Sequence, residues 1–287
     1  MSKKNRFSEG NNPSPFLPLV LFLVLCILLA VTGIMREYKK NKITFPSIKR
    51  PEFPVMKRKT APAEKGKTRI ALIIDDVGWN KAIIKEIEKI NRPLTLSILP
   101  KAQYSKDIFD MLKDKETFEL LLHIPMEPAP PAECRDKGLI QTKMSDEEII
   151  RQFNEDLKDY YPRIRGFNNH MGSAFTADEE KMRIILKEIR SKKMFFVDSM
   201  TTRQSKGFTL AKELGIKTAQ RHVFLDNESD PAYIEKQIRE LVATSRQQGS
   251  AIGLGHARKS TIAVLQNIIP ELEKEGVEIV PVSSLLE

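Results

Sequence analysis

Short apolar runs alternate with amphipathic stretches of helical period from Thr68 to the end of the chain. The apolar runs lie at residues 69–75, 93–99, 118–124, 163–169, 194–199, 222–226, 250–256 and 277–282. Such runs indicate strands buried on both faces, which are typical of a parallel sheet covered by helices. Seven or eight strand–helix units in about 220 residues predict a closed or nearly closed β/α barrel. An open doubly wound sheet is the alternative.

The sequence carries no glycine-rich phosphate loop and no internal repeat. Dinucleotide-binding and P-loop nucleotide-binding folds therefore lack support.

The basic excess of the chain lies outside this β/α region. Residues 1–67 hold 14 of the 47 Lys and Arg and 4 of the 38 Asp and Glu, so residues 68–287 hold 33 and 34, a net charge of −1. A nucleic-acid-binding fold carries its basic patch on the fold itself, so we expect no nucleic-acid partner. The two cysteines, Cys26 and Cys134, are too few for a disulfide framework or a zinc ribbon.

Three segments precede the β/α region. Residues 1–15 form a basic tail, and residues 16–35 form an uncharged run long enough for one transmembrane helix. A cleaved signal peptide is the rival interpretation, but the run has only a poor small-x-small cleavage site. Residues 36–67 are basic and punctuated by prolines, which predicts a linker. Basic residues flank the apolar run on both sides, so the flanking charges alone do not set its orientation.

Residue types that bind metals stand at the carboxyl ends of the predicted strands. In a parallel β/α barrel these ends form the rim that carries the active site. The rim residues are Asp75, Asp76, His123, His170, Asp198, Asp226 and His256. Three of the four histidines of the chain thus fall at one rim. This coincidence favours one shared site.

Two histidines and a carboxylate form a three-ligand metal site that keeps a position open for water. The adjacent carboxylates of Asp75 and Asp76 can divide the work, one binding the metal and the other accepting a proton from water. Neighbouring side chains of a strand diverge, so both reach the site only if the backbone turns, and we expect Val77-Gly78 to provide that turn. A histidine across the rim can protonate the leaving amine.

Several of these residues also have simpler interpretations. Asp226 stands where it can cap the following helix. His222 opens its strand, away from the rim, and is predicted to be structural. Cys134 lies in a proline-rich loop with no histidine nearby in the sequence, which argues against a nucleophile.

Six motifs, in this order, resemble the divergent polysaccharide deacetylase family, a distant branch of the NodB-type carbohydrate deacetylases. They are IIDDVG, LLHIPMEP, NNHMGS, FFVDSMT, VFLDN and GLGHARKSTI. The resemblance covers about residues 68–287. It implies a distorted (β/α)7 barrel and a hydrolase that removes acetyl groups from N-acetylated sugars.

The resemblance also implies roles for individual residues. The first Asp of the NodB-type pair is the general base and the second is a metal ligand, which carries to Asp75 and Asp76. The metal histidines carry to His123 and His170. The leucine–histidine motif carries to Leu254 and His256. Asp198 and Asp226, which end two further predicted strands, and Leu254 are candidates for supporting rim residues.

The sequence departs from the NodB pattern at two places. NodB-type enzymes place both metal histidines in one H-x-x-x-H stretch, whereas the residue four after His123 is Glu127. The second histidine ligand must then come from the next strand, at His170. The Arg-x-Pro motif that tunes the base is not recognisable.

The leading hypothesis is a membrane-anchored deacetylase of a cell-envelope glycan that depends on a divalent metal, with zinc as the first choice. The extracytoplasmic location is implied by the resemblance. A catalytically weak glycan-binding or envelope-scaffold protein is the second hypothesis. A metallohydrolase of another bond, such as a phosphoester, is the third.

Overall fold

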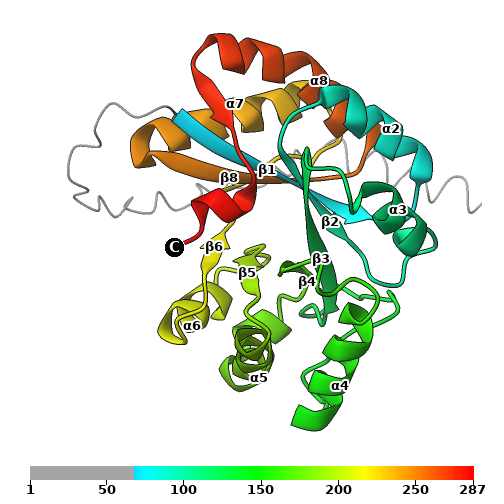
Figure 1. Cartoon of the computed structure of the whole chain (residues 1–287). Coiled ribbons are helices and arrows are strands. Elements are labelled where there is room, and N and C mark those ends of the chain that lie inside the picture. The colour runs from blue at the N-terminus through cyan, green and yellow to red at the C-terminus, as the bar shows by residue number, and fades with distance from the viewer. Residues whose placement is uncertain (1–67) are drawn as a thin grey trace, which may run out of the picture. The chain divides into compact units, whose positions relative to one another are not determined.

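A computed structural model of the chain describes residues 68–287. Within this range, nine parallel strands and seven α-helices alternate (Figure 1). The strands are β1 (Thr68–Val77), β2 (Leu94–Ile98), β3 (Phe118–Met126), β4 (Gly166–Met171), β5 (Phe195–Asp198), β6 (Thr218–Gln220), β7 (Val223–Phe224), β8 (Ser250–His256) and β9 (Val277–Ile279). The helices are α2 (Lys81–Ile90), α3 (Ser105–Leu112), α4 (Asp146–Leu157), α5 (Glu179–Ser191), α6 (Gly207–Glu213), α7 (Pro231–Gln248) and α8 (Lys259–Lys274). Two short 3₁₀ helices are η1 (Phe175–Ala177) and η2 (Val282–Leu285).

The strand order shows that the sheet curls into a barrel. Its path is β6-β5-β4-β3-β2-β1-β8-β7, with β9 paired to β1. The two edge strands, β6 and β7, are joined by only Arg221 and His222. At about 3.8 Å per residue, this link keeps the two edges within roughly 11 Å of each other. The order follows the chain almost strand by strand, so the doubly wound alternative is wrong.

The structure adds one strand that the sequence pattern did not reveal. The pattern predicts a single strand at residues 222–226, whereas the structure forms β6 and β7 on either side of Arg221-His222. Both strands are short, with three and two residues, so neither produces a long apolar run. His222 lies directly before β7, in the link from β6, where its Nδ1 accepts a hydrogen bond from Ile252 N–H. Its structural role is confirmed.

Side chains alternate between two apolar layers along β1. Ile70, Leu72 and Ile74 pack outward in the large core beneath the helices. Ala71 and Ile73 point inward, into a small cluster inside the barrel that also holds Leu254. Because strand side chains alternate with a period of two, the next inward position is Asp75. The strand pleat itself therefore directs Asp75 into the barrel.

Helices cover the outer face of the curled sheet. Figure 1 shows α2, α7 and α8 together on one side of the barrel and α4, α5 and α6 on the other. Helix α4 begins with a capping box in which Ser145 and Glu148 satisfy each other's backbone N–H. This cap fixes the point at which the segment after β3 ends and α4 begins.

The end of the chain fills the amino-terminal opening of the barrel. Val282 lies in the inner cluster, and its N–H donates to Thr95 Oγ1 on β2. Glu287 exchanges two backbone hydrogen bonds with Thr218 on β6. With the amino-terminal end closed, the carboxyl ends of the strands remain as the place for a site.

The predicted transmembrane helix at 16–35, the basic tail and the linker lie outside the described residues. Within 68–287, no helix has the length and apolar character needed to cross a bilayer.

Candidate active site

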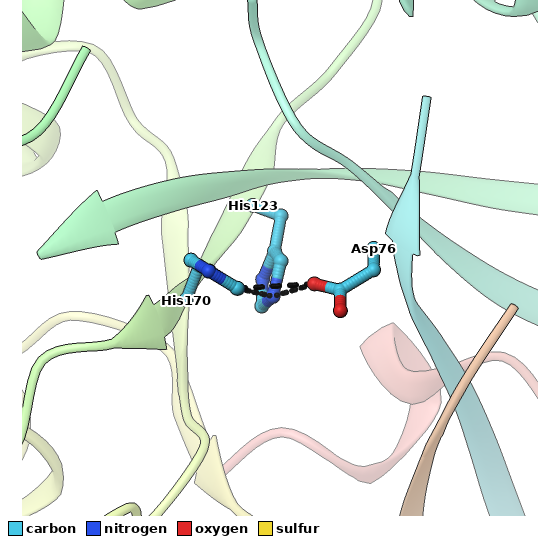
Figure 2. Close-up of side chains that lie close together, drawn as sticks. All are labelled: Asp76, His123 and His170. Carbon is cyan, nitrogen blue, oxygen red and sulfur yellow. Dashed lines mark hydrogen bonds and ion pairs between the residues drawn. The ribbon is translucent and has the colours of Figure 1, made fainter. Parts of the chain in front are cut away.

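Asp76, His123 and His170 converge at the carboxyl ends of β1, β3 and β4. Figure 2 shows the three side chains directed toward a common point. Asp76 Oδ1 lies 3.0 Å from His170 Nδ1 and 3.4 Å from His123 Nε2, and the two nitrogens lie 3.2 Å apart. The sequence prediction that these residues meet at one rim matches this geometry.

The turn that brings Asp76 into the site occurs at Asp76 itself. The strand pleat would direct Asp76 outward, opposite to Asp75. Asp76 instead has a φ of +58°, in the left-handed region, and the pairing register with β2 shifts between Ile74 and Val77. This bulge directs two neighbouring carboxylates to the same side. We predicted a turn at Val77-Gly78, and the structure places it at the residue directly before that pair. Gly78 is required for another reason, because a Cβ there would lie 2.6 Å from Ser105 Oγ.

The three side chains fit a divalent cation. Asp76 Oδ1 is buried and makes no hydrogen bond within the described residues, although two nitrogens are close to it. Three ligand atoms at about 2.0–2.1 Å from a tetrahedral zinc ion lie roughly 3.3–3.4 Å apart, and around an octahedral ion they lie about 2.9 Å apart. The observed separations of 3.0, 3.2 and 3.4 Å lie between these two values. An unsatisfied buried oxygen and two imidazole nitrogens at such distances are a donor set suited to a metal.

Charges in this cluster are strongly coupled. Burial opposes ionisation of Asp76, but His123 and His170 outweigh it and hold the pKa of Asp76 well below its usual range. Burial would lower the pKa of His170, but Asp76, Cys134 and Asp136 raise it to about 10. Without a cation, His170 therefore carries a proton next to the Asp76 carboxylate. A cation bound at Nδ1 takes the place of that proton.

A buried amide, Asn168 of β4, connects Asp75 to His123. Asn168 Nδ2 lies 2.9 and 3.2 Å from the two oxygens of Asp75, and Asn168 Oδ1 lies 2.8 Å from His123 Nδ1. A carboxylate only accepts hydrogen bonds, so the amide nitrogen must face Asp75 and the amide oxygen must face His123. His123 Nδ1 then donates to that oxygen, which leaves the lone pair of Nε2 directed at the cluster. Ser97 also donates to Asn168 Oδ1.

Asp75 is the most buried of the rim carboxylates that face the cluster. It is 2 % exposed and lies next to His256 in the register between β1 and β8. Burial raises the pKa of Asp75, against the lowering effects of His123 and Asn168. A buried carboxylate with a raised pKa, 3.5 Å from Nε2 of His123 in this cluster, is suited to accepting a proton from water.

His256 of β8 lies beside Asp75 of β1 and is held by Asp226. Its Nδ1 is 2.9 Å from Asp226 Oδ1, and its Nε2 points toward the cluster, 3.8 Å from Asp76 Oδ2. Burial would lower the pKa of His256, but Asp226 outweighs it and the pKa is raised. Burial would raise the pKa of Asp226, but His256 and Thr261 lower it. The pair therefore favours a protonated imidazole whose free N–H faces the cluster.

The sequence profile of divergent polysaccharide deacetylases matches residues 72–286. The chain belongs to the divergent polysaccharide deacetylase family.

Two related sequences and one solved structure each match more than three quarters of the chain. An uncharacterised protein of Haemophilus influenzae is 34% identical over 218 residues, which is 76% of each chain. The uncharacterised protein YibQ of Escherichia coli is 26% identical over 252 residues, 88% of this chain and 75% of its own. The crystal structure of the uncharacterised protein ATU2773 from Agrobacterium tumefaciens superposes with a TM-score of 0.72 at 24% identity, over 77% of this chain and 89% of that one. At this identity the superposition shows that the fold is shared.

Glu127 stands where the NodB pattern has its second metal histidine. Its carboxylate faces away from the cluster and accepts hydrogen bonds from Thr142 N–H and Oγ1, both at 2.6 Å. Its backbone N–H also donates to Ile140 O. Glu127 therefore fastens the base of the segment between β3 and α4. The second imidazole of the cluster comes from His170 on the neighbouring strand, as the sequence predicts.

Asp198 does not reach the cluster. Phe196, two residues before it, packs in the outer core, so strand alternation directs Asp198 outward too. Its carboxylate accepts from Met200 N–H, Ser205 Oγ and Phe208 N–H. Asp198 thus ends β5 outside the Asp76–His123–His170 cluster and holds the loop that leads to α6.

Asp226 contacts the rim histidine His256, whereas Leu254 lies inside the barrel. The helix-cap interpretation of Asp226 is wrong, because α7 is capped by Asp230, whose side chain accepts from Tyr233 N–H. Leu254 is 1% exposed and lies one inward position before His256, inside the barrel. Leu254 therefore belongs to the apolar layer inside the barrel, below His256.

Asn168 and Asp136 were missed in the sequence, and Cys134 was considered only as a nucleophile and set aside. Asn168 was hidden because amides are common in loops and strands for many reasons. Asp136 and Cys134 lie in the loop between β3 and α4, where Asp136 Oδ2 is 3.1 Å from His170 Nε2. Both residues are far from any histidine in the sequence, so no motif indicated that they contact one. Cys134, Asp136 and His170 lie close enough to form a second possible ligand group.

Proposed function

We propose that this divergent polysaccharide deacetylase is a metal-dependent hydrolase that removes N-acetyl groups from a cell-envelope glycan. The observation that carries the proposal is the triangle of Asp76 Oδ1, His123 Nε2 and His170 Nδ1, with the buried carboxylate of Asp75 and the His256–Asp226 pair beside it. We propose zinc as the cation, because two imidazole nitrogens and one carboxylate are a common catalytic zinc set.

Hydrolysis of an amide needs two proton transfers, and Asp75 and His256 each perform one of them. A divalent cation held by Asp76, His123 and His170 supplies Lewis acidity toward a carbonyl oxygen and toward water. Asp75 accepts a proton from the water as its oxygen bonds to the acetyl carbon. His256 then gives the proton on Nε2 to the leaving nitrogen as the carbon–nitrogen bond breaks. The products are acetate and a free amine on the sugar.

The positions of the two proton-transfer groups support this division. Asp75 approaches the cluster from β1 and is fixed by Asn168, whereas His256 approaches from β8 and is fixed by Asp226. Their pKa values are both raised, by burial for Asp75 and by Asp226 for His256 against its burial. The raised pKa of Asp75 strengthens it as a proton acceptor, and that of His256 keeps it a proton donor near neutral pH.

We also propose that residues 16–35 anchor the protein in a membrane with the barrel outside the cytoplasm. The uncharged run of 20 residues supports the anchor. The external location follows from the proposed substrate, because an envelope glycan is found there.

Acetate release from a panel of N-acetylated glycans, measured with metal content for matched variants of the full chain, tests the function. Asp75→Asn should keep the metal and lose about 10²–10⁴-fold in turnover, because it removes only the proton acceptor. Asp76→Asn should lose the metal, because a neutral amide replaces an anionic ligand. His256→Ala should keep the metal and slow amine departure.

The same experiment distinguishes the alternative of a glycan-binding scaffold. The deacetylase proposal would be wrong if the metal-loaded wild type released no acetate while the wild type and all three variants bound one glycan equally tightly. The scaffold function would then take its place.

A further inference from the structure

The second nitrogen of His170 has its own partner. In the ligand triangle only Nδ1 of His170 faces Asp76 and His123. The other nitrogen, Nε2, lies 3.1 Å from Asp136 Oδ2, and the side chains of His170 and Asp136 are 16% and 27% exposed. Asp136 comes from residues 127–145, the segment between β3 and α4, and from no strand of the barrel. This contact is separate from the three proposed ligands.

The segment that carries Asp136 is fastened at its base. Glu127 binds Thr142 through its side chain and Ile140 through its backbone, so the segment leaves and returns to the rim at one place. Near its middle, Cys134 Sγ lies 3.6 Å from Asp136 Oδ2. A segment closed in this way holds the Asp136 carboxylate against His170 instead of leaving it in solvent.

A neutral imidazole carries one proton, on one of its two nitrogens. For Nδ1 to bind a cation, the proton must sit on Nε2, and an acceptor there fixes both the tautomer and the ring orientation. Asp136 is an anionic acceptor at hydrogen-bond distance from that nitrogen. Asn168 performs the same task for His123 through the opposite nitrogen. The two histidines are thus oriented from opposite sides of the cluster.

We propose that Asp136 is a positioning residue that fixes His170 in the tautomer able to bind the metal, which rests on the metal site of the proposed function. Asp136 itself touches neither the cation nor the substrate. One cation binds per chain, at Asp76, His123 and His170. Cys134 supports the Asp136 carboxylate and holds no ion of its own.

The test is zinc affinity of the purified full chain, measured by competition with a chromogenic chelator. Loss of an outer partner of a metal-bound histidine typically costs about 10–100-fold in affinity, and Asp136→Ala should weaken zinc binding by that order. Asp136→Asn keeps an acceptor oxygen and should recover part of the loss. Glu133→Gln removes the same charge from the same segment and should change nothing, because Glu133 is 69% exposed and pairs with Arg135.

A spectroscopic measurement separates positioning from a general effect on folding. In the zinc-loaded wild type, proton NMR should show a slowly exchanging imidazole N–H that disappears in His170→Ala. The signal should persist in Asp136→Asn and vanish in Asp136→Ala. If Asp136→Ala does not fold, the affinity and the signal of Asp136→Asn decide, since its weaker acceptor should reduce affinity and shift the signal.

Two results would overturn the proposal. One is zinc affinity and an N–H signal in Asp136→Ala equal to those of the wild type. The other is a second equivalent of zinc in the wild type that is lost in Cys134→Ser, which would make Cys134 and Asp136 ligands. Neither readout uses acetate release, so the positioning role and the deacetylase activity can fail independently.

Discussion

Asp226 holds His256 through both of its carboxylate oxygens. Oδ2 accepts from the backbone N–H of His256 at 2.8 Å, and Oδ1 lies 2.9 Å from the imidazole Nδ1. Thr261 Oγ1 donates to Oδ2 as well, at 2.6 Å. The aspartate is fully buried, so its charge acts on His256 with little screening by solvent.

Replacing Asp226 should alter the pH dependence of the reaction. Asp226 raises the pKa of His256, so Asp226→Asn lowers that pKa and His256 loses its proton at a lower pH. The alkaline limb of the pH–rate profile for acetate release should move to lower pH, and turnover at pH 8 should fall by about tenfold or more. Asp230→Asn is the matched control, because it changes the nearby α7 cap and keeps a good capping residue. An unchanged alkaline limb in Asp226→Asn would argue that His256 is not the proton donor.

Asn168→Asp should disturb both Asp75 and His123, because Asn168 contacts the two side chains. The change keeps the size of the side chain but places a carboxylate against Asp75 and removes the N–H donor. We expect the acid limb of the pH–rate profile to move to higher pH, because a second negative charge raises the pKa of Asp75 further. Turnover near pH 7 should fall by about 10²-fold or more. A variant that melts near the wild-type temperature but keeps the wild-type acid limb would contradict this coupling.

Restoring the NodB-type histidine should not restore a NodB-type site. Glu127 faces Thr142 and not the cluster, so a histidine there is badly placed to replace His170. We expect His170→Ala to bind little zinc and the double variant Glu127→His/His170→Ala to bind no more. Glu127→His alone should destabilise the protein by about 1–3 kcal/mol, because it leaves Thr142 N–H without its acceptor. Zinc content after dialysis and thermal melting provide the two measurements. Recovery of zinc by the double variant would mean that the segment can rearrange.

Asp156 of α4 should make the protein less stable as the pH rises through the weakly acidic range. Its side chain is fully buried beside Lys101, and burial raises its pKa from 3.8 to about 6. The folded protein therefore keeps this proton at pH values where the unfolded chain loses it, so stability falls between about pH 4 and pH 6. A difference of about two pKa units corresponds to roughly 3 kcal/mol. Relative to the wild type, Asp156→Asn should thus gain about 3 kcal/mol in free energy of unfolding between pH 4 and pH 7.

Urea unfolding at the two pH values measures this difference. Asp159→Asn, an exposed aspartate of the same region, corrects for the loss of one carboxylate. A gain for Asp156→Asn that is the same at pH 4 and pH 7 would show that Asp156 is not protonated in the folded protein.

The leader can be tested by fractionation. The full chain should sediment with membranes after mild lysis and be released by detergent, because residues 16–35 are long enough to span a bilayer. A chain that starts at Thr68 should stay in the supernatant. Recovery of the full chain in the supernatant would contradict the prediction that residues 16–35 anchor it in a membrane.

Local patterns were sufficient to predict the barrel and most of its rim. The apolar runs encode strands buried on both faces, and the period of two along each strand decides which residues point inward. That period directs Asp75, His123 and His256 into the barrel and Asp198 away from it. Applying the period to Asp198 at the sequence level would have removed it from the candidates.

The sequence by itself determined the fold class, the family and the residues of the proposed metal site, because these depend on periodicity and on motifs within single segments. Tertiary structure alone decided how those residues are oriented. The left-handed backbone at Asp76 directs two adjacent carboxylates to one site, and Asn168, Asp226 and Asp136 each fix one imidazole. These contacts join residues 30 or more positions apart, and hydrogen bonds at that separation leave no periodic trace in a single sequence. Proton positions in the site therefore follow from the folded arrangement and not from the motifs.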